Sequence, residues 1–241
     1  MSFWKKYERY FKMGIYVILY LIIMFTPLVT RLIGGPLSAL LGISEIGCTS
    51  YVIIMNVFLY LLLLSVSFFL VPDVYYLDFQ IFKHKSAGRK ILEIVIGIQV
   101  VLLASVLGNV FSIVAGGQID SANEEAINSI TTAFGSWAFY PVVIFAGPIV
   151  EEVVFRGIIQ STIIGNKFEK VTNPRVIIGI IATSLLFGLI HVVDAGDYVQ
   201  IFPYFFMGLA LGSIAYATKS IFPPAIVHII NNAIATLLPL L

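Results

Sequence analysis

Charged residues divide this chain into seven long apolar windows, and only one of the seven contains a charge. A helix needs about 20 mainly apolar residues to cross the hydrocarbon core of a bilayer, and each window is about that long. Hydrophobic residues fill 59% of the 241 positions and charged residues only 11%, which excludes an ordinary water-soluble domain. We predict an all-α fold, a polytopic transmembrane helix bundle. The predicted spans are 13–30, 46–72, 94–119, about 137–164, 176–193, 198–218 and 220–241, and boundary errors allow six to eight.

Basic residues gather on one side of these predicted spans. With the N-terminus inside, the inner segments hold Lys5, Lys6, Arg9, Lys12, Lys83, Lys85, Arg89, Lys90, Lys167, Lys170, Arg175 and Lys219, and the outer loops hold Arg31 alone. Cytoplasmic loops are enriched in Lys and Arg, so we predict a cytoplasmic N-terminus, an external C-terminus and a multi-pass protein of the plasma membrane. The acidic loop with Asp120, Glu124 and Glu125 then lies outside. The first window is too long for a signal peptide and lacks a small-residue cleavage site, so we interpret it as a retained span.

Composition also limits the partners of the chain. The net charge of +1 predicts no nucleic-acid partner, and the single Cys48 cannot form an internal disulfide. No repeat, low-complexity segment or linker divides the sequence. We predict one integral membrane domain over 1–241, with the lipid bilayer as its surroundings.

The charged window contains the motif GPIVEEVVFRG at 147–157, with Glu151, Glu152 and Arg156. Three unpaired charges at mid-membrane would cost about 8–10 kcal/mol on an insertion scale, so something must offset that cost. Glu152 and Arg156 are four residues apart on one helix face, which predicts an ion pair. Glu151 points about 100° away from Glu152 around the helix. We predict that Arg156 supports Glu152 and that Glu151 is the working group.

In an alternative interpretation this span ends near Val150, and the three charges form a solvated helix turn in the inner headgroup layer. The apolar pattern continues to Ile164, however, and the basic loop begins only at Lys167. This continuation favours charges that lie within the membrane.

Two of the three histidines, His191 and His228, fall within predicted spans, whereas His84 lies in a basic loop and is expected to be solvated. Two intramembrane histidines and a carboxylate pair on three helices favour one convergent polar site. Phe187 is four residues before His191, so its ring can pack beside the imidazole. His228 and Asn232 are also four apart and share a helix face.

These side chains can support peptide hydrolysis in two ways. In the first, Glu151 deprotonates a water that His191 helps to hold, and N–H groups of His228 and Asn232 stabilise the oxyanion. In the second, Glu151, His191 and His228 bind zinc, because three N/O ligands and a water make a catalytic zinc site. The spacing of the residues does not separate the two.

Three segments, EEVVFR at 151–156, FGLIH at 187–191 and HIINN at 228–232, resemble the motifs of the CPBP family. This family comprises type II CAAX prenyl endopeptidases and bacteriocin-processing proteins and is also called Abi. The motifs occur in the family's order, and the resemblance covers roughly 148–241. Together they are specific, although each alone is weak.

The resemblance implies an intramembrane protease, a hydrolase of all-helical fold with its site in a cavity within the bilayer. It implies that Glu151 is the base, His191 its partner, and His228 with Asn232 the oxyanion stabilisers. The family leaves glutamate-dependent and metal-dependent hydrolysis open. We favour a metal-free site without a required cofactor, because no segment looks built as a dedicated zinc-binding helix. We place the catalytic core helices at 137–241.

The substrate class follows from the same resemblance. A prenylated protein, a pheromone precursor or a bacteriocin leader would each suit a membrane-embedded peptidase, and no residue chooses among them. We expect a peptide or a protein tail rather than a folded substrate.

Other functions remain as alternatives. A non-catalytic immunity or scaffold protein could retain the motifs, and a proton-coupled transporter would also need intramembrane Glu and His. Transport is disfavoured because the sequence has no two matching halves. Other membrane protease classes are excluded, since the chain has neither HExxH nor GxSxG, and 194–197 lacks the first glycine of GxGD.

The depths of the two histidines conflict in a bundle of straight helices. Counted from the inner ends of their spans, His191 lies about 18 Å deeper than His228. The SIFPPA segment before His228 is expected to dip into the membrane, because irregular backbone is tolerated where protein shields it.

Overall fold

The computed structural model describes residues 3–25, 36, 39–40, 42, 45–117, 140–165, 170–193 and 197–238, with side chains from residue 7 in the first helix and from residue 55 in the second. Within these residues every regular element is helical and no strand occurs, which confirms the predicted all-α fold. Several predicted features lie outside the described part, namely Arg31, the acidic loop with Asp120, Glu124 and Glu125, Lys167, and the side chains of Lys5, Lys6 and Cys48.

The helices follow the apolar windows with shifted ends. The first half contains α1 (Phe3–Met24), α3 (Glu45–Leu70), α4 (Pro72–Lys83) and α5 (Ala87–Val114). The second half contains η1 (Pro141–Ala146), α8 (Gly147–Glu152), η2 (Val153–Gln160), α9 (Ser161–Ile164), α10 (Pro174–Val192), η3 (Tyr198–Gln200), α11 (Ile201–Thr218) and α12 (Phe222–Leu237). Two side-chain caps fix the starts of α5 and α10, because Ser86 and Asn173 accept the backbone N–H groups of Arg89 and Arg175.

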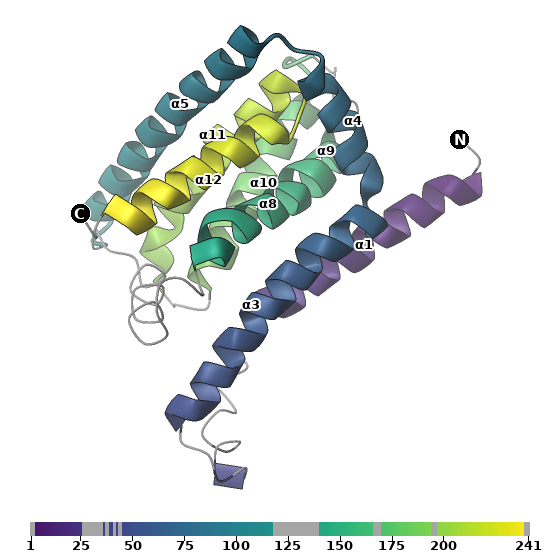
Figure 1. The fold of residues 1–241 in the computed structure, drawn as a ribbon. Helices are drawn as coiled ribbons and strands as arrows, with labels where there is room; N and C mark the ends of the chain where they lie inside the picture. The colour runs from purple at the N-terminus through teal and green to yellow at the C-terminus, as the bar shows by residue number, and fades with distance from the viewer. Residues whose placement is uncertain are drawn as a thin grey trace.

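The second-half helices and α5 form a bundle, and α1 and α3 form a pair beside it (Figure 1). Within the bundle α11 packs against α5, α10 and α12. The segment from η1 to α9 contacts α10 on one side and α12, α3 and α1 on others. This segment, which carries the charged motif, therefore forms the side of the bundle that faces the α1–α3 pair.

A sharp bend corrects the predicted span 46–72. The helix ends at Leu70, and α4 leaves at 81° to it, starting at Pro72 in the first helical turn, where a missing N–H is tolerated. The basic segment at 82–90 was expected to be a loop, but only 84–86 lie between helices, because Lys83 ends α4 and Arg89 and Lys90 lie in the first turn of α5. The predicted span 94–119 also begins earlier, at Ala87, because Ser86 caps it.

The fourth predicted span is one helical rod that changes its winding. Residues 141–146 and 153–160 are π-helical, with the α-helical turn Gly147–Glu152 between them. Pro148 has no N–H to donate to the preceding turn, which breaks the regular α-helical ladder there. Such π segments are frequent at functional sites, and the two here flank Glu151 and Glu152.

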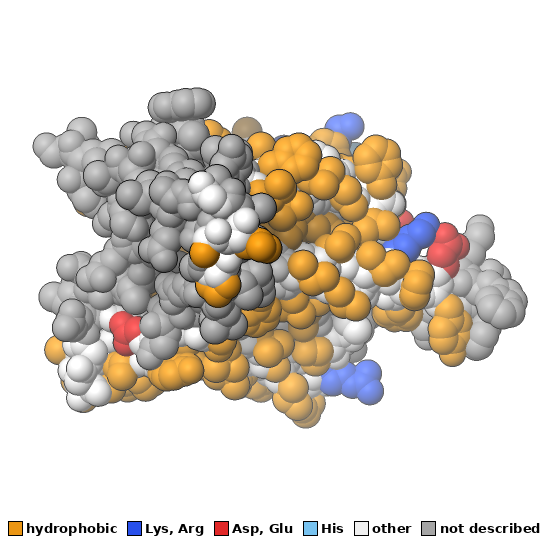
Figure 2. Space-filling model, turned by 90° about the horizontal axis from the view of Figure 1, so that it is seen from below, with side chains coloured by type: hydrophobic (Ala, Val, Ile, Leu, Met, Phe, Trp, Pro, Cys, Tyr) orange, Lys and Arg blue, Asp and Glu red, His pale blue; other side chains and the backbone are white. Residues whose placement is uncertain are grey.

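The described surface suits a lipid environment. Three helices, Ala87–Val114, Pro174–Val192 and Tyr198–Thr218, are each long and apolar enough to cross a membrane, and the bent pair Met55–Leu70 with Pro72–Lys83 makes a fourth candidate. Figure 2 shows hydrophobic side chains over most of the described surface on one face, with Lys and Arg toward one end. The polytopic fold is confirmed, and the count of seven spans stays a prediction.

Candidate functional site

The three charges of the central motif are buried. Glu152 is 0% exposed, Arg156 3% and Glu151 8%. The alternative that made them a solvated helix turn is therefore wrong, and their depth in the membrane stays a prediction.

Glu152 and Arg156 form the predicted ion pair. Arg156 Nη1 donates to Glu152 Oε1 at 2.7 Å, and its Nη2 donates to the Gly208 carbonyl of α11 at 3.2 Å. The guanidinium carbon also lies 4.9 Å from the centre of the Phe187 ring. A buried charge needs such partners, because the membrane interior supplies no water to replace them.

Gly208 allows this contact because α10 and α11 meet closely there. A Cβ at Gly208 would lie 2.9 Å from the Cα of Ser184. One turn later, Gln160 Nε2 donates to the Gly212 carbonyl at 2.9 Å. Two glycines on α11 thus offer backbone oxygens to two polar side chains on η2, and these bonds hold η2 in register against α11.

Both predicted histidines converge on Glu151. His191 Nε2 lies 4.0 Å from Glu151 Oε1, and His228 Nε2 lies 3.7 Å from Glu151 Oε2. His191 comes from the end of α10 and His228 from the second turn of α12. The structure thus brings the three predicted motifs to one carboxylate.

Hydrogen bonds on the far side of each ring fix the histidines. His191 Nδ1 donates to the Phe187 carbonyl at 2.7 Å, and His228 Nδ1 donates to Glu152 Oε1 at 3.1 Å. When the rings are neutral, each Nε2 is therefore an acceptor turned toward Glu151. Both gaps to Glu151 are too long for a direct hydrogen bond. They suit a water that donates to an imidazole and to the carboxylate.

Two aromatic rings pack against His191. The Phe187 ring centre lies 4.4 Å from that of His191, as the spacing predicted, and the Tyr204 ring of α11 stacks at 4.5 Å and 20°. Sequence reasoning missed Tyr204, because no local spacing links α11 to α10. The sequence offered one signal for this contact, namely that Tyr204 is an aromatic residue in the span directly after the span with His191.

Asn232 has a partner that the sequence did not predict. Gly147 N–H donates to the Val142 carbonyl, and Pro148 has no N–H, so neither supplies a donor to the Val143 carbonyl. Asn232 Nδ2 donates to that carbonyl at 3.0 Å. One amide N–H thus ties α12 to η1, and the second N–H of the same amide is left for another acceptor. Asn231 points elsewhere, toward Met207.

The depth conflict between the histidines disappears because the turn between α11 and α12 is buried beneath α4. Ser220 Oγ donates to the Asp78 carbonyl at 3.1 Å, and Ile221 N–H donates to Asp78 Oδ2 at 2.8 Å. Phe222 packs on the rings of Phe79 and Phe82. The two histidines therefore cannot be counted from a common surface. Protein contacts cover the start of the SIFPPA segment, and its dip into the membrane stays a prediction.

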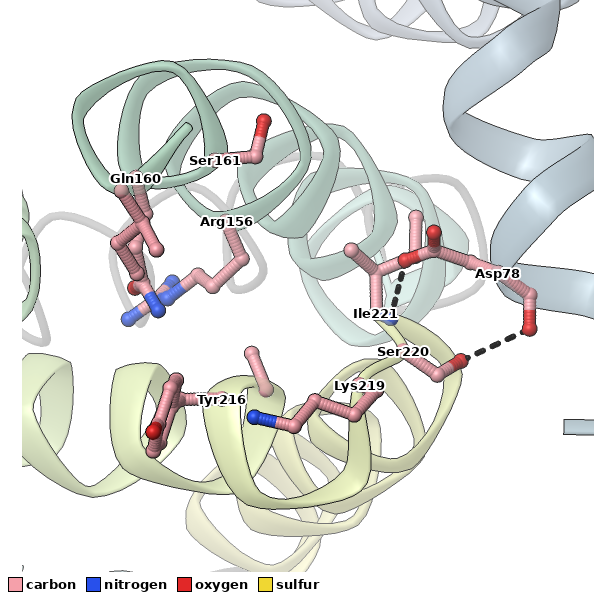
Figure 3. Close-up of a pocket in the computed structure, with 10 residues that line it drawn as sticks. Asp78, Arg156, Gln160, Ser161, Tyr216, Lys219, Ser220 and Ile221 are labelled. Atoms are coloured by element: carbon pink, nitrogen blue, oxygen red, sulfur yellow. Dashed lines mark hydrogen bonds between the residues drawn. The ribbon is translucent and has the colours of Figure 1, made fainter. Parts of the chain in front are cut away.

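A polar pocket lies at this turn, beside the Gln160 end of η2 (Figure 3). Arg156, Gln160 and Ser161 line one side, and Tyr216, Lys219, Ser220 and Asp78 line the other. Lys219 Nζ lies 3.6 Å from the centre of the Tyr216 ring, and partial burial lowers the pKa of its ammonium. Arg156 thus reaches from the Glu152 pair to a polar opening.

In the zinc alternative the donor atoms are of the right kind, but the distances between them are longer than between the ligands of a bound zinc ion. One carboxylate and two imidazole nitrogens are ligands that zinc takes, at about 2.0–2.2 Å, which puts tetrahedral ligands roughly 3.3–3.5 Å apart. The corresponding distances here are 3.7 and 4.0 Å. Among the described residues, no three His, Cys, Asp or Glu side chains are arranged to hold a metal ion. We therefore assign no step to a metal in this geometry.

Comparisons with known proteins match the part of the chain that contains the three motifs. Residues 133–234 match the family of type II CAAX prenyl endopeptidase Rce1-like proteins, and this stretch contains all three motifs. Over this stretch the chain is similar to the CPBP family of membrane proteases. No solved structure matches the chain.

Two bacterial relatives align with the chain over more residues than the family match covers. The chain is 34% identical over 146 residues to the membrane-embedded CAAX protease MroQ of Staphylococcus aureus (strain USA300), which covers 59% of this chain and 55% of MroQ. It is 29% identical over 156 residues to YdiL of Bacillus subtilis (strain 168), named as a membrane peptidase, which covers 64% of this chain and 59% of YdiL. The chain thus spans little more than half the length of these relatives.

Proposed function

We propose that this chain is an intramembrane endopeptidase that hydrolyses a peptide bond in a membrane-associated peptide or protein tail. The observation that carries the proposal is the buried Glu151 carboxylate with two imidazole Nε2 atoms at 4.0 and 3.7 Å. A carboxylate held beside two acceptor nitrogens, in a site walled by apolar side chains, is suited to orient and deprotonate one water.

The first step is attack of that water on the substrate carbonyl. Glu151 takes a proton from the water, His191 Nε2 accepts the second hydrogen bond, and the water oxygen bonds to the carbonyl carbon. The carbonyl π electrons move to oxygen and create an oxyanion. When the intermediate collapses, the C–N bond breaks and Glu151 returns its proton to the leaving amine.

The oxyanion needs donors that are already in place. The free N–H of Asn232 is one candidate. His228 donates at Nε2 only when it carries both ring protons, and Glu152 and Glu151 then lie on either side of the charged ring. Glu152 and Arg156 support the site by holding His228 and η2, and Phe187 packs against His191.

The substrate is proposed from the family alone. A prenylated protein, a pheromone precursor or a bacteriocin precursor each presents a peptide bond close to the membrane. The basic residues favour a plasma-membrane protein with a cytoplasmic N-terminus.

Replacing the base tests the function. Glu151→Gln keeps the shape and removes the proton acceptor, so cleavage should be abolished at normal protein abundance. Secreted and membrane peptidomes of cells with the wild-type or Glu151→Gln copy would identify the lost products. Glu93→Gln is the control, because Glu93 pairs with Lys85 and Arg89 away from the site. Full biological activity of Glu151→Gln would favour the non-catalytic scaffold function.

Chelation tests the metal-free assignment. We expect purified protein to keep its activity after chelator treatment and to contain no stoichiometric zinc. Activity that is lost to chelator and restored by zinc would instead make Glu151, His191 and His228 metal ligands.

A further inference from the structure

The first helix contributes an unexplained polar group to the site. Tyr20 of α1 is 0% exposed, and its hydroxyl has no hydrogen-bond partner among the described residues. A buried donor left unpaired costs about 1–3 kcal/mol, so phenylalanine would be the cheaper residue if the ring alone were needed. Tyr20 also lies far outside 133–234, the stretch that matches the family.

The Tyr20 ring belongs to the wall of the site. It packs edge-on against Phe155 at 6.0 Å, and Phe155 packs edge-on against Phe187 at 5.3 Å. Phe155 follows Glu151 by four residues, so the two share one face of the helical rod, the face turned toward α1. Phe187 in turn lies beside His191.

The Tyr20 ring contacts Phe155, one turn after Glu151, and the Tyr20 hydroxyl interacts electrostatically with Glu151 and Arg156. Its neighbours on α1 and α3 differ. Tyr60 also interacts electrostatically with Glu151, but its hydroxyl donates to the sulfur of Met24. The hydroxyl of Tyr16, one turn earlier on α1, likewise has no hydrogen-bond partner among the described residues, but its electrostatic neighbours are Tyr75 and Ser67 rather than Glu151. Tyr20 therefore combines an unused donor with a place beside the reacting carboxylate.

We propose that Tyr20 is a catalytic hydrogen-bond donor whose hydroxyl stabilises the oxyanion formed next to Glu151. This inference rests on the proposed peptidase function. The donor is unpaired in the resting site and becomes paired when charge develops on the substrate oxygen, so it favours the transition state over the ground state. The Tyr20 hydroxyl would be a second oxyanion donor beside Asn232, because the Asn232 amide already donates one N–H to the Val143 carbonyl.

Tyr20→Phe removes one oxygen and keeps the ring. We expect kcat to fall about 100-fold or more with little change in KM, the size expected for loss of one oxyanion donor. Thermal stability should be unchanged or higher, since an unpaired buried hydroxyl disappears. The assay uses the purified full chain in lipid nanodiscs and a synthetic peptide spanning a bond whose cleavage in cells requires Glu151.

Tyr16→Phe is the matched control, because it removes an equally buried hydroxyl from the same helix. We expect it to keep wild-type kcat. Wild-type kcat in Tyr20→Phe, or equal losses in both variants, would overturn the inference. A fall in melting temperature that accounts for the lost activity would also overturn it, since the hydroxyl would then be structural. If Glu151→Gln is inactive while Tyr20→Phe is fully active, only this inference fails, whereas an active Glu151→Gln defeats the peptidase function itself.

Discussion

Glu152 connects two of the three predicted motifs through one carboxylate oxygen. Its Oε1 atom accepts hydrogen bonds from Arg156 and from His228. We predict that Glu152→Gln lowers the abundance of the protein in membranes, because it leaves Arg156 buried without a counter-charge, a loss of about 3–5 kcal/mol. Immunoblots of membrane fractions beside Glu151→Gln would measure it. The two roles are exchanged if Glu152→Gln accumulates normally but is inactive while Glu151→Gln is unstable.

Asn232 distinguishes the two reaction mechanisms. Asn232→Ala should slow turnover about 100-fold, with substrate binding little changed. Asn232→Asp should be more harmful, because a carboxylate would repel both the oxyanion and the Val143 carbonyl that the amide now contacts. Steady-state kinetics of both variants give the order. An aspartate variant that outperforms the alanine variant would favour a zinc site, where a carboxylate is a good ligand.

From local spacing the sequence could predict those site contacts that join residues four apart on one helix, but it could not predict contacts between helices. Glu152 with Arg156, and Phe187 with His191, are four residues apart, so one helix geometry was enough to pair them. Tyr20 and Tyr204 reach the site from other helices, and nothing in their local sequence indicates the pairing. The Asn232 contact with Val143 was also hidden, because it depends on a carbonyl that loses its donor only when the helix around Pro148 unwinds.

At the scale of elements, the rod from η1 to α9 shows why periodicity alone misjudges this site. An α-helical period of 3.6 residues predicted the relative directions of Glu151 and Glu152, and these two residues are indeed α-helical. The π-helical turns on either side were not predicted, because they arise from tertiary contacts and from Pro148 rather than from residue preferences.

The close packing of α10 on α11 should help to hold the helical rod from η1 to α9 in place, because α11 supplies the carbonyl that Arg156 contacts. We predict that Gly208→Ala destabilises the protein by about 1–3 kcal/mol, since the new Cβ would lie 2.9 Å from the Ser184 backbone and the helices must separate. Separation would also draw the Gly208 carbonyl away from Arg156. Thermal unfolding in detergent measures the change. Gly14→Ala is the control, because its Cβ would meet nothing within 4 Å, and a similar loss there would contradict the packing argument.

At the scale of the whole molecule, contacts between the basic segments place them together at one end of the helix bundle. Arg9 pairs with Asp73 at the start of α4, and Lys85 donates to the Thr218 carbonyl at the end of α11. Ile164, just before the basic segment that contains Lys170, lines the same pocket as Lys219. The charge pattern predicted this grouping because it depends only on which loops share a side. The bend at Val71 escaped prediction, because window length does not reveal that α4 turns back over α12.

This grouping makes the orientation of the chain testable. A reporter fused after Lys170 should be cytoplasmic, since Lys170 belongs to the end where Lys and Arg collect. A reporter fused after Leu241 should be external, because α12 starts at the basic end, beneath α4, and runs beside α5 toward the end of α5 that lies away from the basic residues (Figure 1). Paired alkaline phosphatase and fluorescent protein fusions at both positions give opposite signals on the two sides. A fusion after Lys85 is the control, because it lies in the same basic cluster and should match the reporter after Lys170. If the fusions after Lys170 and Leu241 report the same side, the seven-span count is wrong, and α12, with 16 residues, does not carry the chain across the membrane.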